Sequence, residues 1–478
     1  MAIVAAGAMG TPQVLAPALV AGGTLVPMMP QQPVQPVDPA AARIRELGPG
    51  CELRIIVEDD QHARVKLLSE GPASRRDPNA VCSAEMFGAE LIPGHSYLLH
   101  GGTRTAVYTW HGCRLQLDGP TKQEYDAPNV VMREYLSCAA VLEQRRQRAM
   151  DIDLPAPRVL VCGSNMAGKS SLCQILCNYA MRRERTPIYV DLDTRYSCIR
   201  QLQNLPACVS AMPVEHPPEE EPQRRMSYFF GHIDWSDNPK LYQRVVSHLS
   251  KVVAAKLAHN TSPEGARTAS SGVIINAPFQ PTPELLQRIV ELYEVDVIFV
   301  LDDESLHAAL SKMYAGLPKV HGVPKVEVFP LPKAGGVVQM PPKRLRNLRA
   351  LQVRDYFYGV MKDFSPYSVF MKFDDIELVQ LETAQLSAGM LPVGQDSQKS
   401  VEFIVRPFSG NPKQLENALI AVVRATSMNE VLFAPLCGLV LVTSVEEAGL
   451  QLLSPATPPF PASFLVVGDT KSLKFIDM

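Results

Sequence analysis

A glycine-bounded turn with the pattern GxxxxGK[ST] is the part of this sequence whose residue types and spacing could do chemistry most directly. It consists of Gly163, Ser164, Asn165, Met166, Ala167, Gly168, Lys169 and Ser170, and Ser171 follows. The glycines let the backbone turn tightly, so that several N–H groups point inward and can hold phosphate oxygens. Lys169 supplies a point charge for the β- and γ-phosphates, and the Ser170 hydroxyl is a ligand for Mg²⁺. The pattern predicts a site for a nucleoside triphosphate with magnesium.

A second magnesium ligand is expected from an acid at the end of a neighbouring strand. Asp191 and Asp193 end the apolar run 188–193, and Asp193 is preferred because alternation places it nearest the carboxyl edge of the strand. Asp302 and Asp303 end another apolar run and are the alternative, although an acid at such a position is also a common helix cap. The base-reading motif NKxD is absent from the sequence. We therefore expect adenine, or relaxed base choice.

The elements around the turn follow the order that a P-loop domain needs. An apolar strand is expected at 158–162, and a helix at 170–183 follows the turn. Further strands are expected at 188–193, 272–276 and 295–301, and they alternate with helices at 242–258 and 283–293. Strands that alternate with helices indicate an α/β fold, with a parallel sheet that helices cover on both faces.

Short strands separated by turn residues flank this α/β region on both sides. They are expected at 53–58, 63–68, 95–99, 105–110 and 114–117, and again at 368–373, 376–381, 401–405, 438–444 and 464–467. Helices are expected at 129–148, which connects to the central region, and at 412–426. Frequent turns between short strands are typical of small β-domains. The predicted organisation is a disordered low-complexity tail (1–47), an N-terminal β-sandwich-like domain (48–120), a central P-loop domain (121–354) and a C-terminal β-rich α+β domain (355–478).

Composition narrows the class of protein further. The net charge of the 478 residues is −3, so no overall positive field draws the chain to nucleic acid, and an RNA contact would need a local basic patch. The ten cysteines contain no CxxC pair, which favours reduced thiols in a cytosolic or nuclear protein. The first 42 residues carry one charged side chain, Asp38, and several prolines interrupt them. A signal peptide or a membrane span is not expected there.

Further motifs occur around the P-loop in a fixed order, from Glu52 to the C-terminus. They lie at 52–54, 87–91, 109–113, 190–193, 228–232, 238–242, 295–297, 331–338, 354–359, 441–445 and 453–455. Together they resemble the Clp-one cleavage-and-polyadenylation factors, the polyribonucleotide 5′-hydroxyl kinase family of pre-mRNA 3′-end processing. The resemblance implies ATP with Mg²⁺ and a location in the nucleus. It also implies other cleavage and polyadenylation subunits as partners, with RNA or the tRNA-splicing endonuclease as further candidates and no membrane.

The resemblance assigns roles to residues outside the P-loop as well. Glu52 matches an acid, and Arg104 a basic residue, with which the N-terminal domain helps to hold ATP. Arg349 and Arg354 fall where the family has paired arginines in a lid, here within 343–354. If the chain is active, they form its catalytic set together with Lys169 and Asp193. The alternative is an ordinary surface charge for Glu52 and Arg104, and a solvated basic helix for the lid.

The segments that would hold the RNA end depart from the family pattern. Tyr196 stands where the family usually has Gln, and the clasp motif NTxGW reads Asn276-Ala277-Pro278-Phe279-Gln280. The loss of the stacking Trp removes roughly 1–3 kcal/mol per base, and the loss of substrate orientation lowers the rate further. We therefore favour ATP binding with weak or absent kinase activity. An active RNA 5′-hydroxyl kinase is the alternative, and a P-loop ATPase unrelated to RNA is the third possibility.

Overall fold

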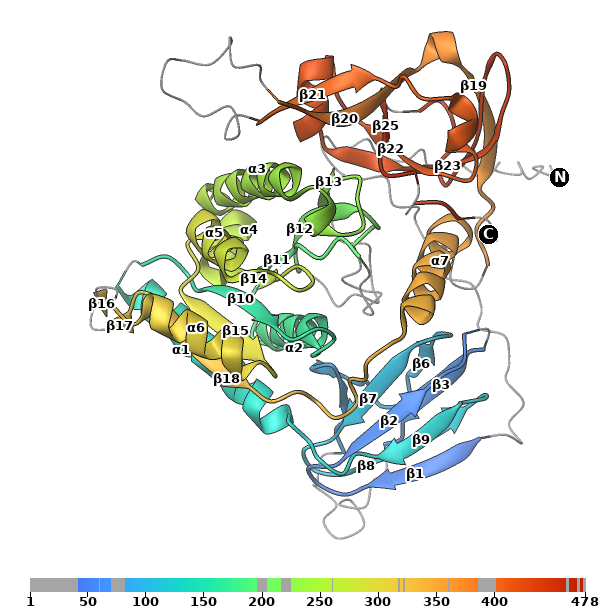
Figure 1. Cartoon of the computed structure of the whole chain (residues 1–478). Coiled ribbons are helices and arrows are strands. Elements are labelled where there is room, and N and C mark those ends of the chain that lie inside the picture. The colour runs from blue at the N-terminus through green and yellow to red at the C-terminus, as the bar shows by residue number, and fades with distance from the viewer. Residues whose placement is uncertain are drawn as a thin grey trace, which may run out of the picture.

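The computed structural model describes the chain in three regions (Figure 1). The described residues are 42–59, 61–69, 82–152, 154–195, 204–215, 225–259, 261–316, 319–320, 323–359, 362–385, 401–460, 464–470 and 473–475. Residues 1–41 of the predicted tail and Tyr196 lie outside them. The predicted end of the tail at residue 47 is wrong, because Arg43–Leu47 form a strand. None of the helices in this described part is both long and apolar enough to cross a bilayer.

The N-terminal region is a sandwich of antiparallel sheets. One sheet has the order β1 (Arg43–Leu47), β8 (Cys113–Asp118), β3 (Ala63–Leu67), β6 (Ser96–Leu99). The facing sheet has the order β5 (Ala89–Glu90), β4 (Glu85–Met86), β7 (Arg104–Tyr108), β2 (Glu52–Ile56), β9 (Gln123–Asp126). Alternate side chains of both sheets enter a shared core, where Leu53, Val65 and Leu117 are all fully buried. The predicted β-sandwich is confirmed, although β1 and β9 extend it beyond the predicted bounds 48–120 on both sides.

The central region is built on a largely parallel sheet. Its order is β13 (Met226–Phe229), β12 (Cys208–Pro213), β11 (Ile188–Asp191), β14 (Val273–Asn276), β10 (Arg158–Gly163), β15 (Val297–Leu301), β18 (Glu327–Leu331). The strands from β11 to β18 in this order pair in parallel, whereas β12 and β13 add an antiparallel edge. A small antiparallel hairpin, β16 (Lys319–Val320) with β17 (Val323–Pro324), lies outside the sheet.

Helices cover both faces of this sheet, as predicted. Helix α1 (Met132–Asp151) and helix α2 (Lys169–Met181) share a core with Val161 and Ile274. Helix α3 (Pro239–Ala258) and helix α5 (Pro283–Tyr293) share the opposite core with Leu160 and Ile275, the neighbours of those residues in the strands. Helices α4 (Pro263–Ser271) and α6 (Glu304–Tyr314) complete this region. Because successive strand residues alternate between the two cores, the buried strands read as continuous apolar runs.

The C-terminal region is a mixed sheet joined to the rest by α7 (Pro342–Tyr358). Its order is β19 (Tyr367–Lys372), β24 (Gly449–Ser454), β23 (Leu436–Val445), β22 (Leu419–Val423), β25 (Phe464–Val467), β20 (Glu377–Gln385), β21 (Val401–Pro407). Figure 1 shows α7 between the N-terminal strands and this sheet. At one end of α7, Arg344 pairs with Asp59, and at the other end the Tyr356 hydroxyl accepts a hydrogen bond from the Leu439 N–H at 3.0 Å. The predicted boundary at 354–355 falls inside this helix.

The helix expected at 412–426 is wrong. A 3₁₀ turn at Pro412–Leu415 is followed by strand β22, which pairs with β23 and β25 on its two sides. All five residues of β22 are buried, and the β-branched Ile420, Val422 and Val423 suit a strand enclosed in this way. Tertiary pairing, which a single sequence does not display, decides the structure of this short apolar run.

Candidate nucleotide site

The P-loop turn lies between β10 and α2, and its glycines are required by its geometry. Gly163 has a φ of +131°, and a Cβ there would lie 2.1 Å from the Leu301 carbonyl oxygen. Gly168 has a φ of +94°, and a Cβ there would lie 3.0 Å from a methyl group of Val337. The Ser164 hydroxyl donates to the Asp302 carbonyl at 2.6 Å and so ties the turn to the end of β15. No residue with a side chain fits either glycine position without strain.

Lys169 begins α2 and folds back over the turn that precedes it. Its Nζ donates to the carbonyls of Gly163 and Ser164 at 3.4 and 3.2 Å. The side chain is nearly buried, and this burial lowers the pKa of the ammonium, while Asp193 acts in the opposite direction. A buried cation beside inward-facing backbone is the arrangement expected where phosphate oxygens supply the missing negative charge.

A cluster of oxygen and amide groups lies beside the start of α2. The Asn276 amide donates to the Ser170 hydroxyl at 3.2 Å and to Asp191 Oδ1 at 3.0 Å. Asp191 is 0% exposed, and its buried Oδ2 has no hydrogen bond to any residue that the structure describes, and the same holds for Asn276 Oδ1. Oxygen atoms left unpaired around a serine hydroxyl are the donor set that Mg²⁺ takes. The residues present therefore fit a magnesium ion, which Ser170 and Asp191 would hold and which would supply positive charge to the acids and to a phosphate.

The pKa values of the two acids, Asp191 and Asp193, are raised. Burial raises the pKa of Asp191 to about 7, and the nearby Asp193 adds to the effect. Burial also raises the pKa of Asp193, although Lys169, Arg195 and Arg349 oppose the shift. Asp193, the preferred metal ligand from the sequence, therefore lies next to the P-loop lysine, whereas Asp191 has the hydrogen-bonded path to Ser170. The two acids act on each other, and a cation is expected to relieve both.

The alternative acids are placed elsewhere. Asp303 caps α6 by accepting from the Leu306 N–H at 2.9 Å. The Asp302 side chain is half-exposed and lies 3.9 Å from Lys333 Nζ. Asp303 thus has the helix-cap role that the sequence left open, and neither side chain joins the cluster around Ser170.

A segment after β18 covers the turn from outside. The Gln339 amide donates to the Asn165 carbonyl at 3.2 Å, and the Met340 N–H donates to Met166 Sδ at 3.1 Å. In the same segment, a Cβ on Gly336 would lie 2.9 Å from Arg54 Nε. The motif at 331–338 was recognised in the sequence without a role. The paired glycines, Gly335 and Gly336, are the feature of this motif that indicates a close contact, because they let the N-terminal domain approach the covering segment.

Glu52 and Arg54 lie side by side in β2, facing this covering segment. Arg54 donates from Nε to Glu52 Oε1 at 2.7 Å and from Nη2 to the Asn129 carbonyl at 3.1 Å. Burial raises the pKa of Glu52, and Arg54 opposes the shift. Arg104 is exposed at the other end of the β2–β7 pair, opposite Ile56. The structure therefore joins Glu52 to Arg54, a residue that sequence reasoning did not single out, and leaves Arg104 apart from it.

The arginines of α7 are also separated. Arg349 is half-buried and close enough to Asp193 to influence its pKa. Arg354, five residues further along, pairs with its neighbour Asp355 at 3.3 Å. Five residues of α-helix rotate a side chain by roughly 140° relative to the first one. The structure thus brings Arg349 to the acids, and it does not show the same for Arg354.

Side chains from two neighbouring segments contact the clasp segment at 276–280. The guanidinium carbon of Arg195 lies 3.4 Å from the ring centroid of Phe279, and Arg195 also pairs with Asp234. The Trp235 indole N–H donates to the Phe279 carbonyl at 2.7 Å. Trp235 is thus beside the clasp, where the sequence alone could not place it. A base that stacked on this face of Phe279 would have to displace Arg195.

Taken together, the glycine turn after a central parallel strand, the lysine and serine that begin α2, and the buried acids define a P-loop domain of the nucleoside-triphosphate-binding class.

Comparisons with known proteins agree with this class and refine it. The family model for the P-loop of the mRNA cleavage and polyadenylation factor CLP1 matches residues 163–359. The model for the N-terminal β-sandwich domain of polyadenylation factor matches residues 46–149, and that for pre-mRNA cleavage complex II protein Clp1 matches residues 364–473.

Individual relatives match over almost the whole chain. Polyribonucleotide 5′-hydroxyl-kinase Clp1 of Homo sapiens is 32% identical over 443 residues, which cover 91% of this chain and 96% of that protein. A CLP1 homolog of Nematostella vectensis is 31% identical and covers 89% of this chain and 95% of its own length. The solved structure of a wild-type Clp1p–Pcf11p complex superposes with a TM-score of 0.71 at 22% identity, covering 90% of this chain and 97% of that one. The chain belongs to the CLP1 family.

Proposed function

We propose that this protein is an ATP-holding subunit of the pre-mRNA 3′-end cleavage and polyadenylation machinery, in which transfer of phosphate to RNA is weak or absent. Its P-loop holds the triphosphate, and Ser170 with the neighbouring acids holds Mg²⁺. We propose the nucleus as its location and the other subunits of that machinery as its partners. The solved relatives are complexes with Pcf11p, which supports a subunit of that kind as one partner.

A contrast between two neighbouring parts of the site carries this proposal. On the nucleotide side, the glycine turn is followed by Lys169 and by the linked Ser170, Asn276 and Asp191. The acceptor side differs, since Arg195 covers the ring of Phe279 in the clasp. A site that has the groups for binding ATP, but in which the segment for the RNA end is covered, is suited to holding ATP rather than to transferring its γ-phosphate.

The contacts between regions indicate what a held nucleotide does. Glu52 and Arg54 of the N-terminal domain face the segment that covers the P-loop. On the far side of α2, the Glu85 carboxylate accepts from the Tyr179 hydroxyl at 2.5 Å and from Arg182 at 2.7 Å. A ligand that binds only the folded state stabilises it by about 2.7 kcal/mol at a hundredfold excess over its Kd. Bound ATP would therefore hold the N-terminal and central domains together.

The alternative function is an active polyribonucleotide 5′-hydroxyl kinase, with RNA or the tRNA-splicing endonuclease as partner. The position of Arg349 near Asp193 favours it, because an arginine at the transferring phosphoryl can be worth ~10³–10⁵ in rate. In that reaction Lys169 would hold the γ-phosphate, Asp193 would accept the proton of the RNA 5′-hydroxyl, and Arg349 would neutralise the developing charge.

A single-turnover assay separates the two functions. Enzyme in excess is mixed with γ-labelled Mg·ATP and a 5′-hydroxyl RNA oligonucleotide, beside Lys169→Ala. We expect label transfer to be absent or far slower than about 1 s⁻¹, while the unmodified protein retains ATP. Transfer at about 1–100 s⁻¹, abolished by Lys169→Ala, would establish the kinase and reject the holding role.

A further inference from the structure

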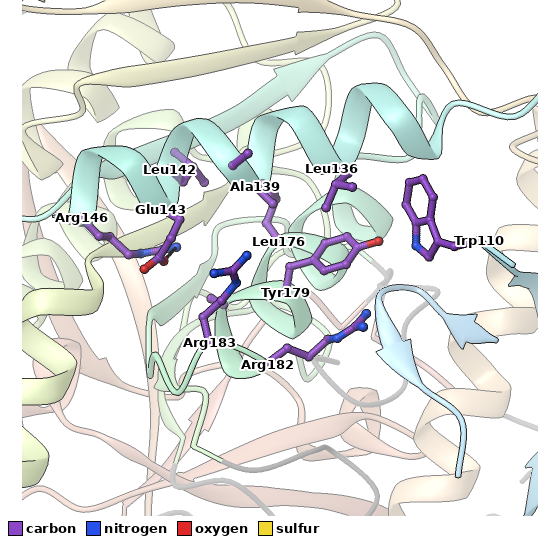
Figure 2. Close-up of a pocket in the computed structure, with 12 residues that line it drawn as sticks. Trp110, Leu136, Ala139, Leu142, Glu143, Arg146, Leu176, Tyr179, Arg182 and Arg183 are labelled. Atoms are coloured by element: carbon purple, nitrogen blue, oxygen red, sulfur yellow. Dashed lines mark hydrogen bonds and ion pairs between the residues drawn. The ribbon is translucent and has the colours of Figure 1, made fainter. Parts of the chain in front are cut away.

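A groove lies between α1 and α2, away from the P-loop (Figure 2). Its volume is about 450 Å³, within the range of ~300–1,000 Å³ typical of built binding pockets. Leu176, Tyr179 and Ala180 of α2 line it, and they lie at the opposite end of this helix from Lys169. The groove is therefore separate from the nucleotide site and connected to it by a single helix.

The walls of the groove are apolar and aromatic. Leu136 and the alanines at 139 and 140 contribute from α1, and Leu136 is exposed to 36% although it is a large apolar side chain. Trp110 of the N-terminal domain closes one end, and its ring packs edge-on against Tyr108 with 4.8 Å between centroids. Tyr179, fixed by its bond to Glu85, stands beside it. Exposed apolar side chains beside a half-buried Trp and a Tyr are typical of protein-binding hot spots.

The charge of the groove is positive. Glu143 is the acid among the lining residues, and it already accepts from Arg146 and Arg185. Arg182 pairs with Glu85 and Glu90. Arg183, on the same edge, is exposed and has no ion pair with any residue that the structure describes. An occupant of this groove would therefore gain from a negative charge near the end of α2.

We propose that the groove binds an amphipathic segment of a partner protein, with apolar side chains between α1 and α2 and an acidic side chain at Arg183. The inference rests on the proposed holding role, since a subunit of that kind needs a surface for its partners. An aliphatic floor suits leucine-like or aromatic anchors at i and i+3 or i+4 of a short helix. Nucleic acid fits less well, because the floor offers alanine and leucine side chains and the cations lie along one edge.

The nucleotide and the groove share α2. The helix begins at Lys169 in the P-loop, and its last turns form the groove wall. The hairpin of β4 and β5 packs on the same helix, where the Asn178 amide donates to the Phe87 carbonyl at 2.9 Å. Trp110 belongs to the same domain as this hairpin. Nucleotide that fixes the N-terminal domain against α2 therefore also fixes the end wall of the groove, and we expect partner binding to strengthen when ATP is bound.

A displayed library of random peptides of about 16 residues, selected on the full chain in Mg·ATP, tests the proposal. Enriched peptides are synthesised, and their affinities are measured by fluorescence anisotropy. We expect apolar anchors flanked by Asp or Glu. Leu136→Asp should weaken binding at least about tenfold, and Ala140→Asp should act alike. Ser137→Asp, exposed on the same helix but outside the groove, should change nothing. Arg183→Glu should weaken acidic peptides about fivefold, unlike Lys256→Glu on α3.

Thermal unfolding of each variant verifies that it folds, and nucleotide released on denaturation is measured in every sample. Protein that retains nucleotide but selects no peptide sensitive to Leu136→Asp and Ala140→Asp overturns the groove proposal alone. Peptides without acidic residues, or indifferent to Arg183→Glu, overturn the charge assignment and with it the proposal. A random-sequence RNA that binds and is lost in Leu136→Asp makes nucleic acid the occupant instead. Absence of nucleotide refutes the holding role, while groove-dependent peptides would still support the docking surface.

Discussion

Replacing Asp191 with Asn should raise the stability of the nucleotide-free protein and reduce the stabilisation that Mg·ATP gives when it binds. Asp191 is fully buried, and burial raises the pKa of its carboxyl group from 3.8 to about 7. A buried acid whose ionised form is disfavoured destabilises the fold, and such groups are typical of binding sites, where a ligand relieves the cost. Asn can still accept from the Asn276 amide and the Asp193 N–H, as Asp191 does now.

The size of the expected stability gain follows from the pKa shift of Asp191. A rise of about three pKa units corresponds to about 4 kcal/mol, which is an upper bound for a single carboxyl group coupled to a second one. Because the folded-state pKa lies above the unfolded-state value, the unmodified protein loses this stability as the pH rises from about 4 to about 7. The gain from Asp191→Asn should therefore grow over that interval and level off above it.

The assay is thermal and denaturant unfolding of nucleotide-free protein in a chelator, at several pH values from about 5.5 to about 8. At the upper end of this pH range, we expect Asp191→Asn to raise the melting temperature of the nucleotide-free protein by several degrees. Addition of Mg·ATP should raise the melting temperature of this variant much less than that of the unmodified protein. Asp303→Asn, which changes the cap of α6, is the control and should show neither effect. The reasoning would be refuted if nucleotide-free Asp191→Asn were less stable than the unmodified protein at about pH 8, or if Mg·ATP raised the melting temperature of both proteins equally.

Three further changes test other contacts. Gly336→Val should push Arg54 away from Glu52 and speed the release of labelled ATP while the fold persists; unchanged release would show that the covering segment does not hold nucleotide. Glu85→Ala removes the carboxylate that accepts from the Tyr179 hydroxyl and from Arg182, and it should cost about 1–3 kcal/mol in urea unfolding. A cost near zero would contradict the docking of β4 and β5 on α2. Arg195→Ala should expose the ring of Phe279 and strengthen the binding of a 5′-hydroxyl dinucleotide, because one stacked base is worth ~1–3 kcal/mol; weaker binding would instead make Arg195 a contact for RNA.

The P-loop and the class of fold could be predicted from the sequence because their signals are local. The turn from Gly163 to Ser170 is contiguous, and the buried strands β10, β14 and β15 are apolar runs that are each followed by a helix. The small strands β4 and β5 were missed because two residues each are too short to show a period. The run in β22 was misassigned for the related reason that a short apolar stretch suits a helix and a buried strand equally.

The candidate site could be predicted only where its residues follow one another in the chain. The role of Asn276 depends on β14 lying beside both β10 and β11, and a sequence does not show strand order. The contact between Arg195 and Phe279 joins residues from two strand ends, and that between Arg54 and Gly336 joins two domains. The residues assigned to the site, including Glu52, Arg104, Arg349 and Arg354, stay predictions until nucleotide is bound and seen.

The nucleotide content of the purified protein tests the central claim most directly. The protein is denatured after extensive washing, and the released small molecules are separated and identified by mass. We predict close to one adenosine triphosphate per chain, intact at its γ-phosphate, and none in Lys169→Ala. Folded protein that releases no nucleotide, and shows no change in melting temperature on addition of Mg·ATP, would contradict the account.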